Sequence, residues 1–165
     1  MKVLYLEDND NACKNIEEFN REEFQIDIDF VDTITALDEI LYEMEEYKNY
    51  GAVVIDLSID MPFFTKEDIV KQIPELGRED VPTTCTEQYI PLYGLDYYKY
   101  VIAKRSQTQK MVEEGRIIFF TGHASKIRSR GLYSEKDPLF KNTRLIDRAE
   151  KNATGKLFSI LRELK

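Results

Sequence analysis

The sequence feature that most constrains the fold is a short apolar run that ends on a carboxylate, Gly51-Ala-Val-Val-Ile-Asp-Leu-Ser58. Its β-branched residues Val53, Val54 and Ile55 leave no polar face, which is typical of a strand buried on both sides in a parallel sheet. Asp56 follows where such a strand leaves the sheet. Because open α/β sheets bind ligands at the carboxyl ends of their strands, Asp56 is either a functional acid or an ordinary turn residue.

The rest of the chain alternates short apolar runs with segments of helical periodicity. Further strands are predicted at residues 3–6, 26–30, 117–120 and 144–147, and the acidic alternation of 26–30 is typical of an edge strand. Helices are predicted after a cap at Asn9 or Asp10, after a capping box formed by Thr35 and Asp38, and at 95–112, 124–131 and around 157–164. Five strands alternating with five helices predict a parallel sheet with helices on both faces.

One segment interrupts this alternation. Residues 59–93 hold four of the five prolines, and Thr65 with Asp68 forms a further capping pair before Pro74. Such long irregular loops are uncommon inside a compact domain and are often functional. The segment either covers the site after Asp56 or is a surface elaboration without a chemical role. We expect one domain over residues 1–165, with 59–93 as an insertion within it.

Composition argues against several classes of function. Acidic residues outnumber basic ones 31 to 23, for a net charge of −8, so we do not expect a nucleic-acid-binding surface. The single histidine, His123, and the isolated cysteines, Cys13 and Cys85, argue against a zinc site and favour free thiols in a reducing cytosol. No apolar run approaches the roughly 20 residues of a membrane span. We expect a cytoplasmic protein without a membrane partner.

Polar residues follow four of the five predicted strands. They are Glu7 and Asp8 after the first, Asp56 after the third, Thr121 after the fourth, and Asp147-Arg148 at the end of the fifth. In a doubly wound sheet of order 2-1-3-4-5 the first and third strands are neighbours, which brings three carboxylates together. Three acids repel one another unless a cation intervenes, and oxygen ligands of this charge suit Mg²⁺. Singly, each of these residues is also an ordinary cap or turn residue.

This arrangement resembles the receiver domain of two-component response regulators. The resemblance covers the chain outside residues 59–93, and it rests on Val3-Leu-Tyr-Leu-Glu7-Asp8, Val53-Val-Ile-Asp56 and Ile117-Ile-Phe-Phe-Thr121-Gly and on the order of the helices between them. It implies a flavodoxin-like α/β fold with a doubly wound five-stranded parallel sheet of order 2-1-3-4-5. Since the chain stops after the last helix, we expect a stand-alone receiver that switches partners.

The resemblance also implies roles for particular residues. Asp56 would accept a phosphoryl group from a sensor histidine kinase or a phosphotransfer protein, and the phosphorylated state would change the binding of a downstream protein. Glu7, Asp8, Asp56 and the backbone carbonyl of Ser58 would hold Mg²⁺. Ser58 and His123 would flank the path of the water that hydrolyses the acyl phosphate, and His123 can exchange a proton near neutral pH.

Three positions depart from the family pattern. The family has Lys-Pro where this chain has Arg148-Ala149, so either Arg148 or Lys151, one turn later, would supply the positive charge that binds the phosphoryl group with Thr121. The family's Met-Pro pair after the acceptor is matched by Met61-Pro62, displaced by about two residues on our alignment. The insertion is the third departure.

Two other functions compete with the phosphorylated receiver. One is a pseudo-receiver, an interaction module whose acidic site is vestigial, which Arg148-Ala149 favours. The other is a Mg²⁺-dependent phosphohydrolase with Asp56 as nucleophile, which Ser58 disfavours because such enzymes need a second acid at that position. We expect no enzyme beyond self-phosphorylation from small phosphodonors and autodephosphorylation. The tyrosine-rich stretch at 89–100 is either a contact surface or part of the core.

Overall fold

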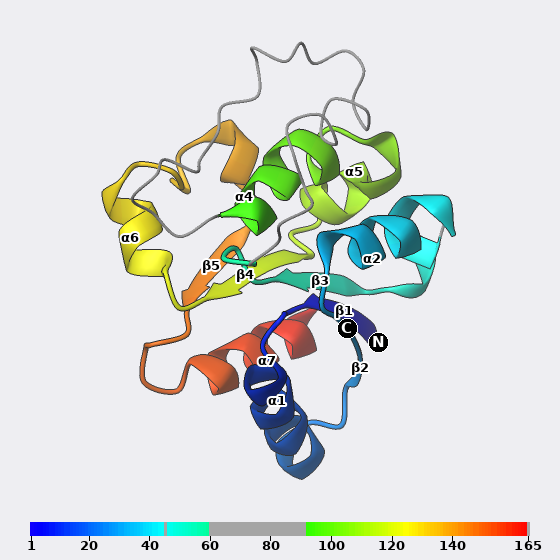
Figure 1. Ribbon diagram of the computed structural model, residues 1–165, viewed down its shortest axis with the longest axis vertical. Coiled ribbons are helices and arrows are strands. Elements are labelled where there is room, and N and C mark those ends of the chain that lie inside the picture. The colour runs from blue at the N-terminus through cyan, green and yellow to red at the C-terminus, as the bar shows by residue number, and fades with distance from the viewer. Residues whose placement is uncertain (45, 60–91, 165) are drawn as a thin grey trace.

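A five-stranded parallel sheet forms the centre of the molecule (Figure 1). The computed structural model describes residues 1–44, 46–59 and 92–164. The strands are β1 (Lys2–Leu6), β2 (Asp27–Val31), β3 (Ala52–Ile55), β4 (Ile117–Thr121) and β5 (Arg144–Asp147). Their order is β2-β1-β3-β4-β5, and every neighbouring pair is parallel. The predicted flavodoxin-like fold and its strand order are confirmed.

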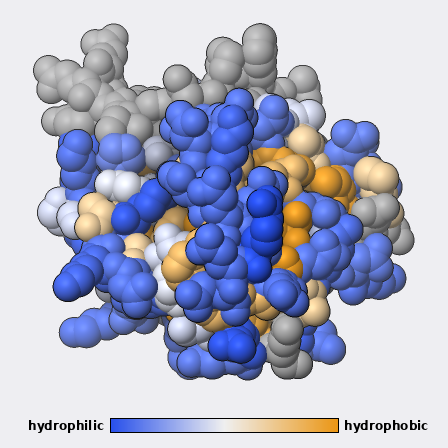
Figure 2. Space-filling view, turned by 90° about the horizontal axis from the view of Figure 1, so that it is seen from below, coloured by the Kyte–Doolittle hydropathy of each residue, from blue (hydrophilic) through white to orange (hydrophobic). Residues whose placement is uncertain are grey.

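Helices cover both faces of the sheet. They are α1 (Asp10–Glu23), α2 (Ile34–Asp38), α4 (Tyr93–Tyr97), α5 (Ser106–Glu113), α6 (Ala124–Ser129) and α7 (Ala153–Glu163). In Figure 1, α1 and α7 lie on one side of the sheet and the other four on the opposite side. Figure 2 shows the molecule from below, where the surface is mostly hydrophilic and apolar residues are visible only between polar ones.

Successive side chains of each strand alternate between two apolar cores. Val53 and Ile55 of β3 belong to the core under α2, α4, α5 and α6, whereas Val54 belongs to the core under α1 and α7. All of β3 is fully buried. The apolar run before Asp56 is therefore the central strand that its β-branched residues predicted, and β2 is an edge strand, as its alternating pattern predicted.

The predicted capping box at Thr35 and Asp38 is wrong. The N-cap of α2 is Thr33, whose Oγ1 accepts a hydrogen bond from the backbone N–H of Ala36 at 3.1 Å. This earlier start buries Ile34 completely in the core. Asp38 is itself buried and accepts a hydrogen bond from the Tyr97 hydroxyl at 2.6 Å, so its carboxylate serves tertiary packing. The predicted cap at Asn9 is confirmed.

The single helix predicted at 95–112 is two helices. After α4 the chain continues as a turn of π-helix at Tyr98–Ile102 and breaks before α5 begins at Ser106. The Thr108 hydroxyl donates to the Ile102 carbonyl at 2.7 Å, which satisfies a carbonyl that the helix end leaves without a helical partner. Another turn of π-helix follows α2 at Glu39–Glu43, and 3-10 turns lie at Glu46–Asn49 and Pro138–Phe140.

Part of the predicted organisation lies outside the described residues. The predictions concerned are the body of the insertion (60–91), the capping pair Thr65 and Asp68, Met61-Pro62, Cys85 and Tyr89. At the two ends of the insertion, Ile59 and Leu92 are both buried in the larger core. Tyr97 and Tyr98 are fully buried, so these two tyrosines belong to the core. No helix in the described part of the chain is long and apolar enough to cross a membrane.

Candidate functional site

The backbone ladder continues beyond the last residues of three strands and holds the site in place. The N–H of Glu7 donates to the Val31 carbonyl at 2.9 Å, and the N–H of Asp56 donates to the Leu6 carbonyl at 3.0 Å. On the other side, the N–H of Arg148 donates to the Thr121 carbonyl at 2.9 Å. The residues that follow β1, β3 and β5 therefore have fixed positions at the carboxyl edge of the sheet.

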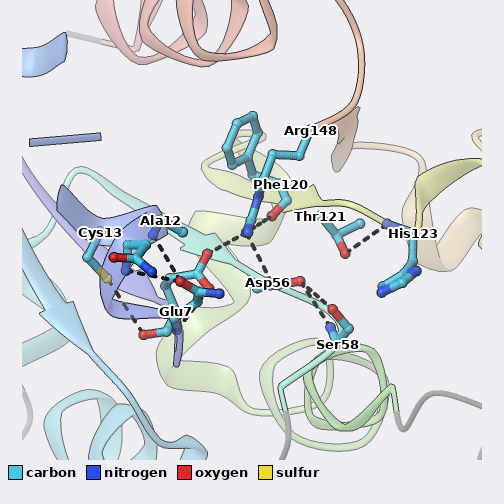
Figure 3. A network of polar contacts seen from close by, with 11 residues as sticks. Glu7, Ala12, Cys13, Asp56, Ser58, Phe120, Thr121, His123 and Arg148 are labelled. Carbon is cyan, nitrogen blue, oxygen red and sulfur yellow. Dashed lines mark hydrogen bonds and ion pairs between the residues drawn. The ribbon is translucent and has the colours of Figure 1, made fainter. Parts of the chain in front are cut away.

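The Arg148 side chain joins the two acids of this edge (Figure 3). Its Nη2 forms ion pairs with Glu7 Oε2 and, at 3.0 Å, with Asp56 Oδ2, and it donates to the Phe120 carbonyl at 3.1 Å. The Glu7 and Asp56 side chains are 1% and 6% exposed, whereas Arg148 is 27% exposed. The guanidinium thus lies between the two buried carboxylates and closes the site toward solvent.

The charges of this cluster do not balance when both acids are ionised, because one guanidinium faces two carboxylates. Burial raises the pKa of Glu7 to about 7, Arg148 opposes this shift, and Asp56 adds to it. The N–H of Asn9 donates to Glu7 Oε1 at 3.1 Å, which also favours the ionised form. Near neutral pH, Glu7 is therefore divided between its protonated and ionised forms.

Asp56 has hydrogen-bond partners on both carboxylate oxygens. Its Oδ1 accepts from the Ser58 backbone N–H at 3.0 Å and from the Ser58 hydroxyl at 3.1 Å, while Oδ2 faces Arg148. Ser58 thus orients the carboxylate. The role that the resemblance implies for the Ser58 carbonyl stays a prediction.

Thr121 and His123 lie on the β4 side of the site (Figure 3). Thr121 is fully buried, and its Oγ1 accepts a hydrogen bond from the His123 backbone N–H at 3.4 Å. His123 is half-buried and immediately precedes α6. The backbone of the His123 turn is therefore tied to the Thr121 hydroxyl.

Two of the predicted site residues are not part of this cluster. Asp8 is exposed, and the acid that reaches Arg148 is Glu7. Lys151 is also exposed and makes no hydrogen bond or ion pair with any described residue, so Arg148 is the cation at Asp56. Among residues 1–44, 46–59 and 92–164, no group of three or more His, Cys, Asp or Glu side chains is arranged to hold a metal ion.

The oxygens around Arg148 nevertheless fit a divalent cation. Three acceptors, from Glu7, Asp56 and the Phe120 carbonyl, surround one nitrogen that carries two hydrogens. The Nε atom of Arg148 is also buried, and it has no hydrogen-bond partner among the described residues. A guanidinium therefore matches these oxygens imperfectly, whereas carboxylate and carbonyl oxygens around one point suit Mg²⁺. Glu7 and Asp56 would hold the ion if the Arg148 side chain moved away from their carboxylates.

Sequence reasoning missed two features of this edge. It predicted that Arg148 binds a phosphoryl group, but it did not predict the ion pair between Arg148 and Glu7. The excess of acidic residues at the predicted edge of the sheet indicated that such a cation was needed there. It also gave Asp147 no partner. Asp147 accepts from the Ser125 hydroxyl at 2.7 Å and from the Ala149 N–H at 3.0 Å, and these bonds hold its pKa below the usual range.

Comparison with protein-family models and curated proteins adds no relative. No protein-family model matches this chain, and no curated protein matches it significantly. The resemblance to receiver domains therefore rests on the residues quoted above and on the flavodoxin-like fold, and a fold of this kind hosts many unrelated functions. The chemistry of the site carries any functional argument: a buried, oriented carboxylate beside a guanidinium and a second acid.

Proposed function

We propose that the protein is a receiver that accepts a phosphoryl group on Asp56 in a Mg²⁺-dependent reaction and changes its binding to a partner protein as a result. The observation that carries this proposal is the setting of Asp56. Ser58 orients Oδ1, and Arg148 and Glu7 lie on the side of Oδ2. A carboxylate held in this way is suited to nucleophilic attack on phosphorus.

The chain's own residues have separable tasks in this reaction. An Asp56 oxygen forms the new P–O bond, and the donor group leaves with the electrons of the bond that breaks. Arg148 binds phosphoryl oxygens with donors now directed at Glu7 and Asp56, and the buried Thr121 hydroxyl binds another. Bound Mg²⁺ would neutralise the charge of the transferred group. The donor would be a sensor histidine kinase or a phosphotransfer protein.

One observation favours the pseudo-receiver as a second candidate. Arg148 already pairs with Glu7 and Asp56, so the two buried acids have a counter-ion without any ligand. In an interaction module, that triad would be a permanent structural link between β1, β3 and β5. The phosphohydrolase has less support, because Ser58 donates two hydrogen bonds to Asp56 and offers no acid for the leaving group.

Intact mass after incubation with Mg²⁺ and acetyl phosphate separates these functions. We expect the wild-type chain to gain the mass of one phosphoryl group, Asp56→Asn to gain none, and Asp147→Asn to be labelled like the wild type. Asp147 is the matched control because it is a buried acid at the same edge that bonds to Ser125 and not to Arg148.

Other results would contradict the proposal. Equal labelling of Asp56→Asn would remove Asp56 as the acceptor. An unlabelled wild type that keeps its fold would favour the interaction module, and steady phosphate release from unrelated phosphate esters would favour the phosphohydrolase.

A further inference from the structure

Gly94, in the first turn of α4, lies directly against the backbone that follows β3. A Cβ atom at position 94 would be 3.0 Å from the Leu57 Cα and 3.2 Å from the Asp56 carbonyl carbon, and closer still to the Asp56 carbonyl oxygen. All three neighbours are main-chain atoms, which cannot rotate away as a flexible side chain can. Either α4 or the peptide between Asp56 and Leu57 must therefore move if residue 94 carries a side chain.

Helix α4 is held in place on both of its flanks. The Tyr97 hydroxyl donates to the buried Asp38 carboxylate of α2 at 2.6 Å, and the Tyr98 hydroxyl donates to the Leu139 carbonyl at 2.7 Å. The side chains of Tyr97 and Tyr98 are fully buried, as is Leu95 beside Gly94. Leu57 is fully buried as well, and Ser58 after it is half-buried. Because the hydrogen bonds of Tyr97 and Tyr98 hold α4 in place, a side chain at 94 is expected to displace the Asp56–Leu57 peptide.

Displacement at Leu57 acts on the Asp56 carboxylate through one short turn. Ser58 follows Leu57, and its N–H and hydroxyl both donate to Asp56 Oδ1. A shift of the peptide carries these donors away from the carboxylate and changes the approach of Oδ2 to Arg148. A misplacement of about 1 Å can slow a positioned reaction by roughly 100-fold.

We propose that Gly94 is a positioning residue for Asp56. The missing side chain lets α4 pack against the Asp56–Leu57 peptide and fix the turn in which Ser58 orients the carboxylate. Glycine is less favourable in a helix than alanine, and the close approach gives a reason for it here. The kinetic part of this inference rests on the proposed phosphorylation of Asp56, whereas the geometric part does not.

Gly94→Ala and its matched control Gly122→Ala test the inference. Gly122 lies at the same edge of the sheet, directly after Thr121, but a Cβ there would have no neighbour within 4 Å. In Gly94→Ala, we expect exchange of the Ser58 amide hydrogen to accelerate at least about tenfold. Labelling by acetyl phosphate should slow by about 100-fold, with an unchanged far-UV circular dichroism spectrum. Gly122→Ala should match the wild type in both measurements.

A second pair of variants covers the case in which Gly94→Ala does not fold. Tyr97→Phe releases α4 from Asp38 without adding atoms, and Tyr133→Phe removes a buried hydroxyl bond to the Thr143 carbonyl elsewhere in the fold. We expect faster Ser58 amide exchange in Tyr97→Phe alone. Equal exchange in both tyrosine variants would overturn the inference.

Two results with Gly94→Ala itself would also overturn the inference. The first is exchange of the Ser58 amide hydrogen at the wild-type rate. The second is labelling by acetyl phosphate at the wild-type rate although exchange shows that the Ser58 hydrogen bond is lost. If the wild-type chain takes up no phosphoryl group, the proposed function fails, and the amide exchange of Gly94→Ala against Gly122→Ala still decides whether Gly94 positions Asp56.

Discussion

Glu7 directly follows β1, and Asp147 is the last residue of β5, so both lie at the same edge of the sheet. Both are buried, but their carboxylates are held in different ways. Asp147 accepts hydrogen bonds from Ser125 and from the Ala149 backbone, and its pKa lies below the usual range. Burial raises the pKa of Glu7 to about 7, although Arg148 opposes the shift. Hydrogen-bond donors that serve Asp147 alone thus lower its pKa and favour its ionised form. The guanidinium that Glu7 shares with Asp56 lowers the pKa of Glu7 by less than burial raises it.

The comparison separates an acid that has its own hydrogen-bond donors from an acid that shares a cation with a second acid. The hydrogen bond from Ser125 to Asp147 connects α6 to the end of β5, and it stabilises the charge of the Asp147 carboxylate without a bound cation. Glu7 and Asp56 instead share Arg148, so additional positive charge or a phosphoryl group could rearrange their contacts. The predictions below follow from this difference.

The largest effect is expected from removal of the shared cation. Arg148→Gln leaves Glu7 and Asp56 buried without a counter-ion, and breaking a buried pair costs about 3–5 kcal/mol of unfolding free energy. If Mg²⁺ binds as proposed, it should raise the melting temperature of Arg148→Gln more than that of the wild type, because the ion and Arg148 would then neutralise the same acids. Thermal unfolding with Mg²⁺ and with chelator measures both effects.

Arg144→Gln is the control for this experiment. Arg144 is the first residue of β5, and Arg148 directly follows this strand. The ion pair of Arg144 with Glu163 is exposed, with side chains 41% and 67% exposed, so we expect little loss of stability. Equal Mg²⁺-induced shifts in Arg148→Gln and the wild type would show that Arg148 and the ion do not share a site.

The pH dependence of stability should differ in sign for the two acids. The folded pKa of Glu7, about 7, exceeds its usual 4.5, so the native state binds more protons between these values. The Glu7 contribution to stability is thus complete below pH 4.5 and is lost as pH rises through 7, on the order of 3 kcal/mol in total. Glu7→Gln should remove this slope in urea unfolding curves with chelator.

Asp147 should behave in the opposite way. Its folded pKa is lowered, so its contribution is present above its usual pKa of 3.8 and is lost as pH falls further. Asp147→Asn should reduce only this loss at acid pH. A Glu7→Gln protein that keeps the wild-type slope between pH 4.5 and 7 would contradict the account of the shared cation.

The smallest effect is expected at His123. If Asp56 is phosphorylated, His123 and the small Ser58 flank the approach of the hydrolytic water. His123→Ala should then slow the decay of phosphorylated protein by only a few-fold, which is below the roughly 10²–10⁴-fold effect of a full acid–base catalyst. Decay of isolated phosphoprotein measures this, with the exposed Lys126 of α6 as the Lys126→Ala control. Equal decay of the two variants would exclude a role for His123.

Much of the fold was predictable because its signals are local. The apolar run Val53–Ile55, the alternating strand at 26–30 and the Asn9 cap each reflect neighbours within a few residues. The predicted strand order is that of a common doubly wound sheet, and the resemblance implied the same order. The edge position of Glu7, Asp56, Thr121 and Arg148 followed in turn, since parallel strands place their carboxyl ends together.

The sequence by itself determined which segments become strands, their order, and which polar residues meet at one edge, since burial patterns and connection rules act along the chain. The tertiary structure alone decided which acid Arg148 contacts, why Asp38 is buried, and why residue 94 is glycine. Arg148 and Glu7 are 141 positions apart, and Tyr97 and Asp38 are 59 apart. Such contacts depend on packing between distant elements, and no periodicity within one element encodes them.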